Sequence, residues 1–319
     1  MAGGPLTPRP PVPGRLDHDL YDARFAPRDP GVRWPGERDV AAFALVHVEA
    51  FEIDAPAGAR RDPALRGDFG SFFPDYRAHS LVEYGTRIGI FRLLDVLQPL
   101  GWHVAAAVNG LVARQRPLLV RDLAARGVEV LASGWSASRM ITSAMDADEE
   151  RASLAQSIDA VAQATGASPR GYASQDYGWS ARTAAALESL GIAHAVDWPN
   201  DERPYRFGPQ RRIVMLPAAA ELDDAQAMLA RKLQPRAWEA TVREALDAWR
   251  ERALPGSVFA LPLHAWVAGA AHRTPALRRA LAAHDGARFW QASPAAIAAH
   301  WHAAAPLGDA QRPPVSARR

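Results

Sequence analysis

Short apolar stretches alternate with amphipathic helix patterns along most of this chain, and this alternation most restricts its fold. Runs rich in β-branched and small apolar residues predict strands at 40–48, 104–108, 128–132, 171–174, 192–196, 213–216, 258–263 and 288–290. Helices are predicted between them, at 85–98, 117–127, 146–166, 180–191, 223–231, 235–252, 275–283 and 293–302. Repeated strand–helix units favour a parallel sheet, and seven or eight such units favour a barrel over an open sheet.

Two of the predicted helices carry clear local signals. The apolar residues of 85–98 recur at helical spacing, which predicts one buried face; they are Ile90, Leu93, Leu94 and Leu97. In the helix at 146–166, Asp146 is followed three residues later by Glu149, a capping-box pattern, and Gly166 is the stop signal.

The alternating pattern extends over one continuous stretch of the chain. It predicts a single domain at 39–302, long enough to bury one large core. The segment 1–38 is rich in proline and glycine and is expected to be an irregular arm, and 303–319 a flexible tail. The arm could wrap around a neighbouring copy, so a homo-oligomer is compatible with the sequence.

Composition excludes several classes of protein. The chain has no cysteine, which rules out disulfides, thiolate metal sites and cysteine nucleophiles. The net charge is only +2 and the charges are interspersed, so no nucleic-acid partner is expected. No apolar run approaches the roughly 18 residues of a membrane span, and no secretory signal is recognised, so we expect no membrane association and a cytoplasmic location.

In α/β barrels the chemistry is located where the strands end, at their carboxyl termini. The first such position is the segment 47–54. Glu49 has apolar neighbours on both sides, which raises the pKa of a carboxyl group and suits a catalytic base or acid. Glu52 is expected to be solvated, and His47 to be a satisfied core histidine.

The strand exits at 132–140 and 171–179 supply candidates for substrate binding. In the first, small residues allow a ligand to approach the backbone, Trp135 could stack on it, and Arg139 could hold a carboxylate or carbonyl. Equally, this is an ordinary glycine and serine loop. In the second, Asp176 is a candidate contact within a loop that otherwise caps the next helix.

The last two exits are richer in polar groups. The segment 197–205 places acidic, amide and aromatic groups between prolines directly after a strand, so Asp197, Asn200 and Asp201 are candidate substrate contacts; a turn-forming Asn-Asp pair is the alternative. His264 follows an apolar strand and could act as a general acid or as a hydrogen-bond donor to an oxyanion.

No cofactor or metal site follows from local patterns. Phosphate-loop, dinucleotide and His-Glu-x-x-His patterns are not present. His300 and His302 are two apart on a predicted helix, a spacing that does not bring both to one metal ion. The expected partner is a small-molecule substrate.

Taken in order, several motifs resemble the polysaccharide deacetylase (NodB-homology) superfamily, in particular its allantoinase-like, or chitooligosaccharide deacetylase-like, branch. The stretch from Tyr84 to Arg92 is similar to that branch's Tyr-Gly-x-Arg-x-Gly-[IV]-[WF]-Arg signature. Further similar stretches are Trp34-Pro-Gly, 48–54, 197–205, Leu263-His264 and 289–301, so the likeness spans roughly 30–302. The resemblance implies a deformed (β/α) barrel and hydrolysis of a carbon–nitrogen bond in an amide.

The resemblance also identifies departures from the superfamily's pattern. Metal-dependent members carry an acidic pair after the first strand and two histidines after the third. Here the pair is reduced to Val48-Glu49, Ser133 takes a histidine position, and Arg139 is retained. The allantoinase-like branch works without a metal. Within it, this chain further departs at Ala137, Trp179 and Arg182.

Three hypotheses about function follow. The first is a metal-independent hydrolase of carbon–nitrogen bonds other than peptide bonds, acting on a small ureide or acylamino compound. In it, Glu49 is the base or an orienting group, His264 is the acid or oxyanion donor, and Asp197, Asn200, Asp201 and Arg139 hold the substrate. The second is a non-catalytic relative that binds a metabolite or a partner protein. The third is a metal-dependent carbohydrate deacetylase.

Overall fold

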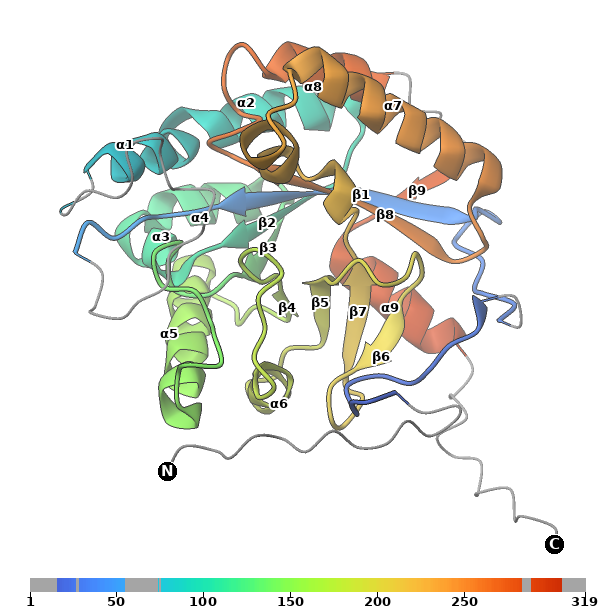
Figure 1. Cartoon of the computed structure of the whole chain (residues 1–319), viewed down its shortest axis with the longest axis horizontal. Coiled ribbons are helices and arrows are strands. Elements are labelled where there is room, and N and C mark those ends of the chain that lie inside the picture. Colours follow the sequence, from blue (N-terminus) through green and yellow to red (C-terminus); the bar gives the residue numbers. More distant parts are fainter. Residues whose placement is uncertain (1–15, 27–28, 55–73, 75, 283–287, 306–319) are drawn as a thin grey trace, which may run out of the picture.

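The protein is described by a computed structural model, which places residues 16–26, 29–54, 74, 76–282 and 288–305 (Figure 1). Its centre is a single nine-stranded sheet of order β6-β7-β5-β4-β3-β2-β1-β8, in which β9 pairs with β1. The strands are β1 (Val40–Val48), β2 (Val104–Val108), β3 (Glu129–Ala132), β4 (Gly171–Tyr172), β5 (His194–Asp197), β6 (Tyr205–Phe207), β7 (Ile213–Pro217), β8 (Ser257–His264) and β9 (Phe289–Gln291). All pairings are parallel except that of β6 with β7.

The sheet curls toward closure at its two ends. An isolated parallel bridge joins Ala218, just beyond β7, to Ala260 in β8. The α/β fold with the deformed barrel architecture predicted from the sequence is confirmed. Because the carboxyl ends of the parallel strands meet on one side, side chains at the exits of β1, β5 and β8 come close together.

Helices surround this sheet (Figure 1). They are α1 (Tyr76–Tyr84), α2 (Ile90–Leu97), α3 (Gly110–Gln115), α4 (Pro117–Ala125), α5 (Ala147–Thr165), α6 (Thr183–Ser189), α7 (Pro235–Arg252), α8 (Thr274–Ala282) and α9 (Pro294–Ala304). The predicted cap of α5 is confirmed, since the Asp146 side chain accepts from the Glu149 backbone N–H and Gly166 ends the helix at φ 82°. No helix in the described parts of the chain is long and apolar enough to cross a lipid bilayer.

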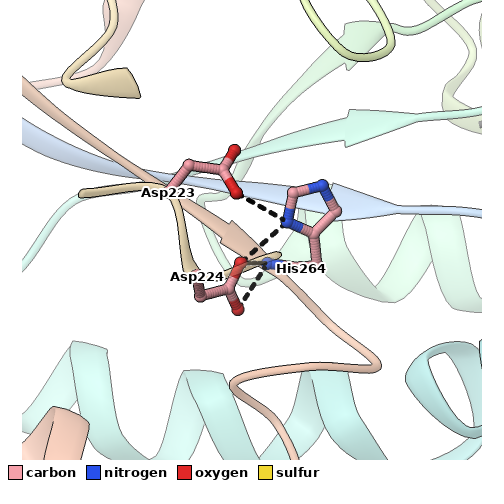
Figure 2. Close-up of side chains that lie close together, drawn as sticks. All are labelled: Asp223, Asp224 and His264. Atoms are coloured by element: carbon pink, nitrogen blue, oxygen red, sulfur yellow. Dashed lines mark hydrogen bonds and ion pairs between the residues drawn. The ribbon is translucent and has the colours of Figure 1, made fainter. Parts of the chain in front are cut away.

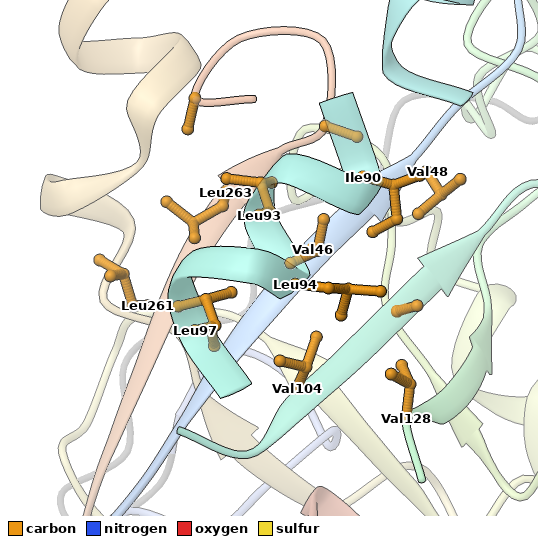
Figure 3. Packing of buried hydrophobic residues seen from close by; sticks show 14 of the residues in the cluster. Val46, Val48, Ile90, Leu93, Leu94, Leu97, Val104, Val128, Leu261 and Leu263 are labelled. Carbon is orange, nitrogen blue, oxygen red and sulfur yellow. The ribbon is translucent and has the colours of Figure 1, made fainter. Parts of the chain in front are cut away.

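Strand β1 divides the core into an outer and an inner layer. Its nine residues are all buried, as expected for a parallel strand covered on both faces. Alternate side chains, such as Val46, pack outward against α2 and β8, and Figure 3 shows Leu93 and Leu97 of α2 in this layer. The others, including Phe43 and Leu45, fill the barrel interior. His47 follows Leu45 on the inner face and is therefore directed to the carboxyl end of the barrel.

Two predicted helices differ in the structure. The helix predicted at 85–98 continues directly from α1, and its first part, Gly85–Gly89, is a π-helix that leads into α2. A Cβ at Gly89 would lie 1.9 Å from the Ala265 carbonyl oxygen, so only glycine permits this close packing on the loop after β8. The helix predicted at 223–231 is present over 224–230, with Gln226–Ala230 as a π-helix, and a 3₁₀ turn at Ala220–Leu222 precedes it.

The described part of the predicted arm packs on the edge strand β6, which sequence patterns did not predict. Tyr21 stacks on Phe207 at 6.1 Å between ring centroids, and Leu20 accepts a backbone hydrogen bond from Gly208. The buried Arg203 side chain donates to the carbonyl oxygens of Ala26 and Asp29. Residues 1–15 and 27–28 of the predicted arm and residues 306–319 of the predicted tail lie outside the described residues.

Candidate active site

A pocket opens at the carboxyl ends of β1, β5 and β8, between the loops that follow β4 and β7. The empty space between these elements is about 390 Å³, open solvent at the mouth included. The polar side chains that line it are His47, Ser174, Asp176, Tyr177, Asp197, Asp223, Gln226 and His264.

His264, the last residue of β8, is held by the buried carboxylate of Asp224 (Figure 2). The His264 Nδ1 lies 2.7 Å from Asp224 Oδ1. The same carboxylate accepts the backbone N–H groups of His264 (2.9 and 3.0 Å) and Ala268 (2.8 Å), which fixes its position. The hydrogen bond orients the imidazole ring, and among the described residues no side chain is bonded to its other nitrogen, Nε2.

Asp223 is the second carboxylate beside His264, with Oδ1 3.8 Å from Nδ1. It accepts the backbone N–H groups of Ala225 (2.9 Å) and Gln226 (3.0 Å), so it caps the short helix that follows. The Tyr177 hydroxyl donates to its Oδ2 at 3.2 Å. Burial raises the pKa of Asp223 above its ordinary value.

The rings of His264 and His47 stack, with centroids 4.7 Å apart and planes inclined by 14°. Burial lowers the pKa of His264, but the charges of Asp223, Asp224 and Glu49 outweigh burial and hold that pKa well above its usual value. Burial and the neighbouring His264 charge hold the pKa of His47 well below its usual value. These opposite shifts favour a charged His264 beside a neutral His47.

Asp197, the last residue of β5, is the third carboxylate of the pocket. It accepts the Ser174 backbone N–H at 2.7 Å and the Ser174 hydroxyl at 2.9 Å. Burial raises the pKa of Asp197 to about 6, against these hydrogen bonds.

Among the residues predicted from the sequence, His264, Asp197 and Asp176 line the pocket. Asp176 lies at its exposed rim at φ 48° and accepts from the Gln226 amide at 3.1 Å. Glu49 is buried beside the pocket, where its Oε2 accepts the Trp266 indole N–H at 2.7 Å. Their roles in substrate binding and catalysis stay predictions.

Trp135 and Arg139 are brought together, but around Glu52. Arg139 Nη2 lies 2.7 Å from Glu52 Oε1, the Trp135 indole N–H donates to that oxygen at 3.2 Å, and Ser136 donates to Oε2 at 2.7 Å. Neither Trp135 nor Arg139 lines the pocket, since their polar groups tie the loop after β3 to the loop after β1. The expectation that Glu52 is a solvated residue is wrong for the same reason.

Asn200 and Asp201 also lie away from the pocket lining. The Tyr205 hydroxyl donates to Asn200 at 2.7 Å, and Asp201 accepts the backbone N–H groups of Glu202 (2.7 Å) and Arg203 (3.0 Å). These bonds fit the turn-forming alternative, in which both side chains hold the loop after β5.

Sequence patterns did not indicate Asp223, Asp224 or the place of His47 in the pocket lining. The two adjacent aspartates follow the strand at 213–216, so the rule applied to other strand exits would have included them. The sequence pattern instead predicts that they begin a helix. His47 is a buried histidine as expected, but it lines the pocket, and its ring is not bonded to any described side chain.

The residues present do not fit the metal site that the resemblance implies. Ser133, at a histidine position, has a buried hydroxyl with no hydrogen-bond partner among the described residues. Elsewhere, ligand atoms of Asp223, Asp224 and His264 lie within 4.8 Å of one another, close enough for an ion. However, the Asp224 carboxylate already accepts two backbone N–H groups and the His264 ring, and these contacts suit a proton-holding pair better than a metal site.

Known proteins that resemble this chain have the same fold. A family model described as polysaccharide deacetylase matches residues 82–195. A solved structure from Mycobacterium smegmatis, assigned as a polysaccharide deacetylase, is similar at 25% identity and a TM-score of 0.71, over 86% of this chain and 93% of that one. The structure of an allantoinase, Puue, and one from Pseudomonas aeruginosa PAO1 assigned as a polysaccharide deacetylase are each similar at 22% identity and a TM-score of 0.75, over 88% of this chain and 96% of theirs.

The resemblance to the polysaccharide deacetylase family is therefore confirmed. No curated protein sequence matches the chain. The family match ends at residue 195, before Asp197, Asp223, Asp224 and His264. The polar residues at the centre of the pocket must therefore be interpreted from their own geometry.

Proposed function

We propose that this protein is a metal-independent hydrolase that cleaves a carbon–nitrogen bond in a small acylamino or ureide compound, with His264 as the general acid. The single observation that carries the proposal is the Asp224–His264 pair. The Nδ1 of His264 lies 2.7 Å from the buried Asp224 carboxylate, while no described side chain is bonded to Nε2 of this pocket-lining residue. An amide nitrogen is a poor leaving group until it is protonated, and a fixed imidazolium supplies that proton.

The surrounding carboxylates keep His264 in the protonated form that this role requires. Asp223, Asp224 and Glu49 together raise its pKa despite its burial. In this account Glu49 acts through the charge of His264, because its own Oε2 is engaged with Trp266. The imidazolium also supplies a hydrogen bond to the oxygen that becomes negative as water adds to the carbonyl.

The lining of the pocket restricts the substrate. Asp176, Asp197 and Asp223 contribute carboxylates, whereas no arginine or lysine occurs among the described lining residues. A substrate carboxylate would be repelled there, so the site favours neutral or positively charged compounds rich in N–H donors. Among the similar structures, one is named an allantoinase and two are assigned as polysaccharide deacetylases, which supports a substrate with an acylated or ureide nitrogen.

The proposal is tested by screening neutral ureides, N-acetyl sugars and N-acyl amines for release of ammonia or amine. The His264→Gln variant is the test protein, and His103→Gln, which alters an exposed histidine, is the matched control. Turnover that is lost in His264→Gln and kept in His103→Gln supports the proposal. A substrate hydrolysed equally well by His264→Gln contradicts it.

A second candidate function is binding without turnover. It is favoured by two residues of the loop after β3. Ser133 stands where the resemblance implies a histidine, and Arg139 is paired with Glu52. A compound that raises the melting temperature and is recovered unchanged after long incubation would support this alternative.

A further inference from the structure

His47 is a buried histidine whose ring contributes no hydrogen bond to a described residue. It lies in β1, is 6% exposed and lines the pocket beside His264. His194, buried at the opposite end of the barrel, instead has its Nε2 2.8 Å from a Glu129 oxygen. Because buried polar groups are normally satisfied, the ring nitrogens of His47 are available to a molecule in the pocket.

The charges around the two stacked rings differ. Asp224 and Asp223 lie against His264 Nδ1, at 2.7 and 3.8 Å, so the positive charge belongs on that ring. No ion pair joins His47 to a carboxylate among the described residues. The titratable groups that face this part of the pocket are His264, Asp223, Asp224, Glu49, Asp197, Asp176 and Tyr177.

We propose that His47 is the general base of the reaction, an inference that rests on the proposed function. Its free imidazole nitrogen takes a proton from water as the water oxygen bonds to the carbonyl carbon. His264 then gives its proton to the leaving nitrogen as the carbon–nitrogen bond breaks, which yields a carboxylic acid and an amine. The proton on His47 is released to solvent and His264 is reprotonated, so one water is consumed per bond.

The protonation states of the stacked pair agree with these roles. Burial and the charge of His264 keep His47 neutral at neutral pH, and the carboxylates keep His264 charged. Two titratable groups with pKa values pushed apart are the arrangement that assigns a base and an acid within one site. Glu49 is less suited to be the base, because its Oε2 accepts from Trp266 and it does not line the pocket.

The kinetic test uses two probes, 4-nitrophenyl acetate and 4-nitroacetanilide. Nitrophenolate leaves without protonation, so ester cleavage needs the base much more than the acid. His47→Gln is expected to lose roughly 10²–10⁴-fold with both probes. His264→Gln is expected to lose that much with the anilide and much less with the ester, because with the ester only its hydrogen bond to the oxyanion is lost. Added imidazole is expected to restore part of the ester cleavage by His47→Ala, and His103→Gln to match the wild type.

The outcomes separate this inference from the proposed function. If wild-type protein cleaves the probes and His47→Gln cleaves the ester at the wild-type rate, His47 is not the base, although hydrolysis stands. If wild-type protein cleaves neither these probes nor any compound of the screen, the proposed function and the role of His47 both fail.

A second readout does not depend on turnover or on a variant's folding. The experiment is an NMR pH titration of the wild-type protein with labelled histidines. When the pH is lowered through 6.5, the His47 ring is expected to stay neutral. When the pH is raised through 6.5, the His264 ring is expected to stay protonated. A spectrum in which His47 takes up its proton before His264 would overturn the assignment.

Discussion

Two groups of polar residues lie at the same end of the barrel, and they differ in how their hydrogen bonds are satisfied. Around Glu52, the side chains of Trp135, Ser136 and Arg139 all donate to one carboxylate. Around His264, which lines the pocket, one ring nitrogen is fixed by Asp224 while no described side chain is bonded to the other. The first group holds two loops together, and in the second a ring nitrogen has no partner among the described side chains.

This difference shows why residue type at a strand exit is a weak guide to chemistry. Arg139 and His264 are equally reasonable candidates in the sequence. Arg139 is engaged by a neighbouring carboxylate, and to bind a substrate it would have to exchange that partner. His264 needs no such exchange. The comparison therefore predicts effects on turnover for the group around His264, and on stability for the group around Glu52.

The largest expected effect is the loss of turnover in Asp224→Asn. An amide in place of the carboxylate no longer stabilises the imidazolium or fixes its tautomer, so we expect kcat to fall roughly 10²–10⁴-fold. Stopped assays at equal concentrations of folded protein, checked by circular dichroism, measure this change. If a folded Asp224→Asn protein keeps the wild-type kcat, the group around His264 does not differ from the group around Glu52 in its effect on turnover.

The next effect concerns Asp197 and the pH dependence of stability. Its pKa of about 6 in the folded protein exceeds the ordinary 3.8, so the folded state retains its proton longer than the unfolded state. The contribution of Asp197 to stability therefore falls as the pH rises from about 4 to about 6, by roughly 3 kcal/mol. Asp197→Asn should remove this fall, as measured by urea unfolding at pH 4 and pH 7. If the difference in unfolding free energy between the wild type and Asp197→Asn is the same at pH 4 and pH 7, the burial argument is contradicted.

Glu52→Gln should change stability more than chemistry. The amide cannot pair with Arg139 as a carboxylate does, so the free energy of unfolding is expected to fall by about 1–3 kcal/mol. The exposed Glu251→Gln is the control, for which a change below about 1 kcal/mol is expected. If Glu52→Gln keeps full stability but loses kcat, the loops around Glu52 belong to the catalytic site after all.

The smallest effect is expected for Glu49→Gln. Glutamine still accepts the Trp266 indole N–H but removes a charge that raises the pKa of His264. The alkaline limb of the pH–rate profile, which reports loss of the His264 proton, should therefore move to lower pH while kcat on the plateau is largely kept. A collapse of kcat at every pH would instead make Glu49 the base.

The sequence predicted the barrel because strand and helix periodicity is local information. It also predicted Asp197 and His264 at the site, because the exits of parallel strands converge whatever their loops do. The pairing of Arg139 with Glu52 was not predictable, since it depends on which loops come into contact. The aspartates 223 and 224 were missed because adjacent polar residues before an apolar run also begin helices.

The central claim is that the pocket works through His264 and its carboxylates without a metal ion. It is tested most directly by measuring metal content and turnover on the same chelator-treated sample. The account predicts that turnover of the substrate found by screening persists with far less than one equivalent of metal, and that added Zn²⁺ does not increase it. Turnover that disappears on chelation and returns with one equivalent of Zn²⁺ would contradict the account.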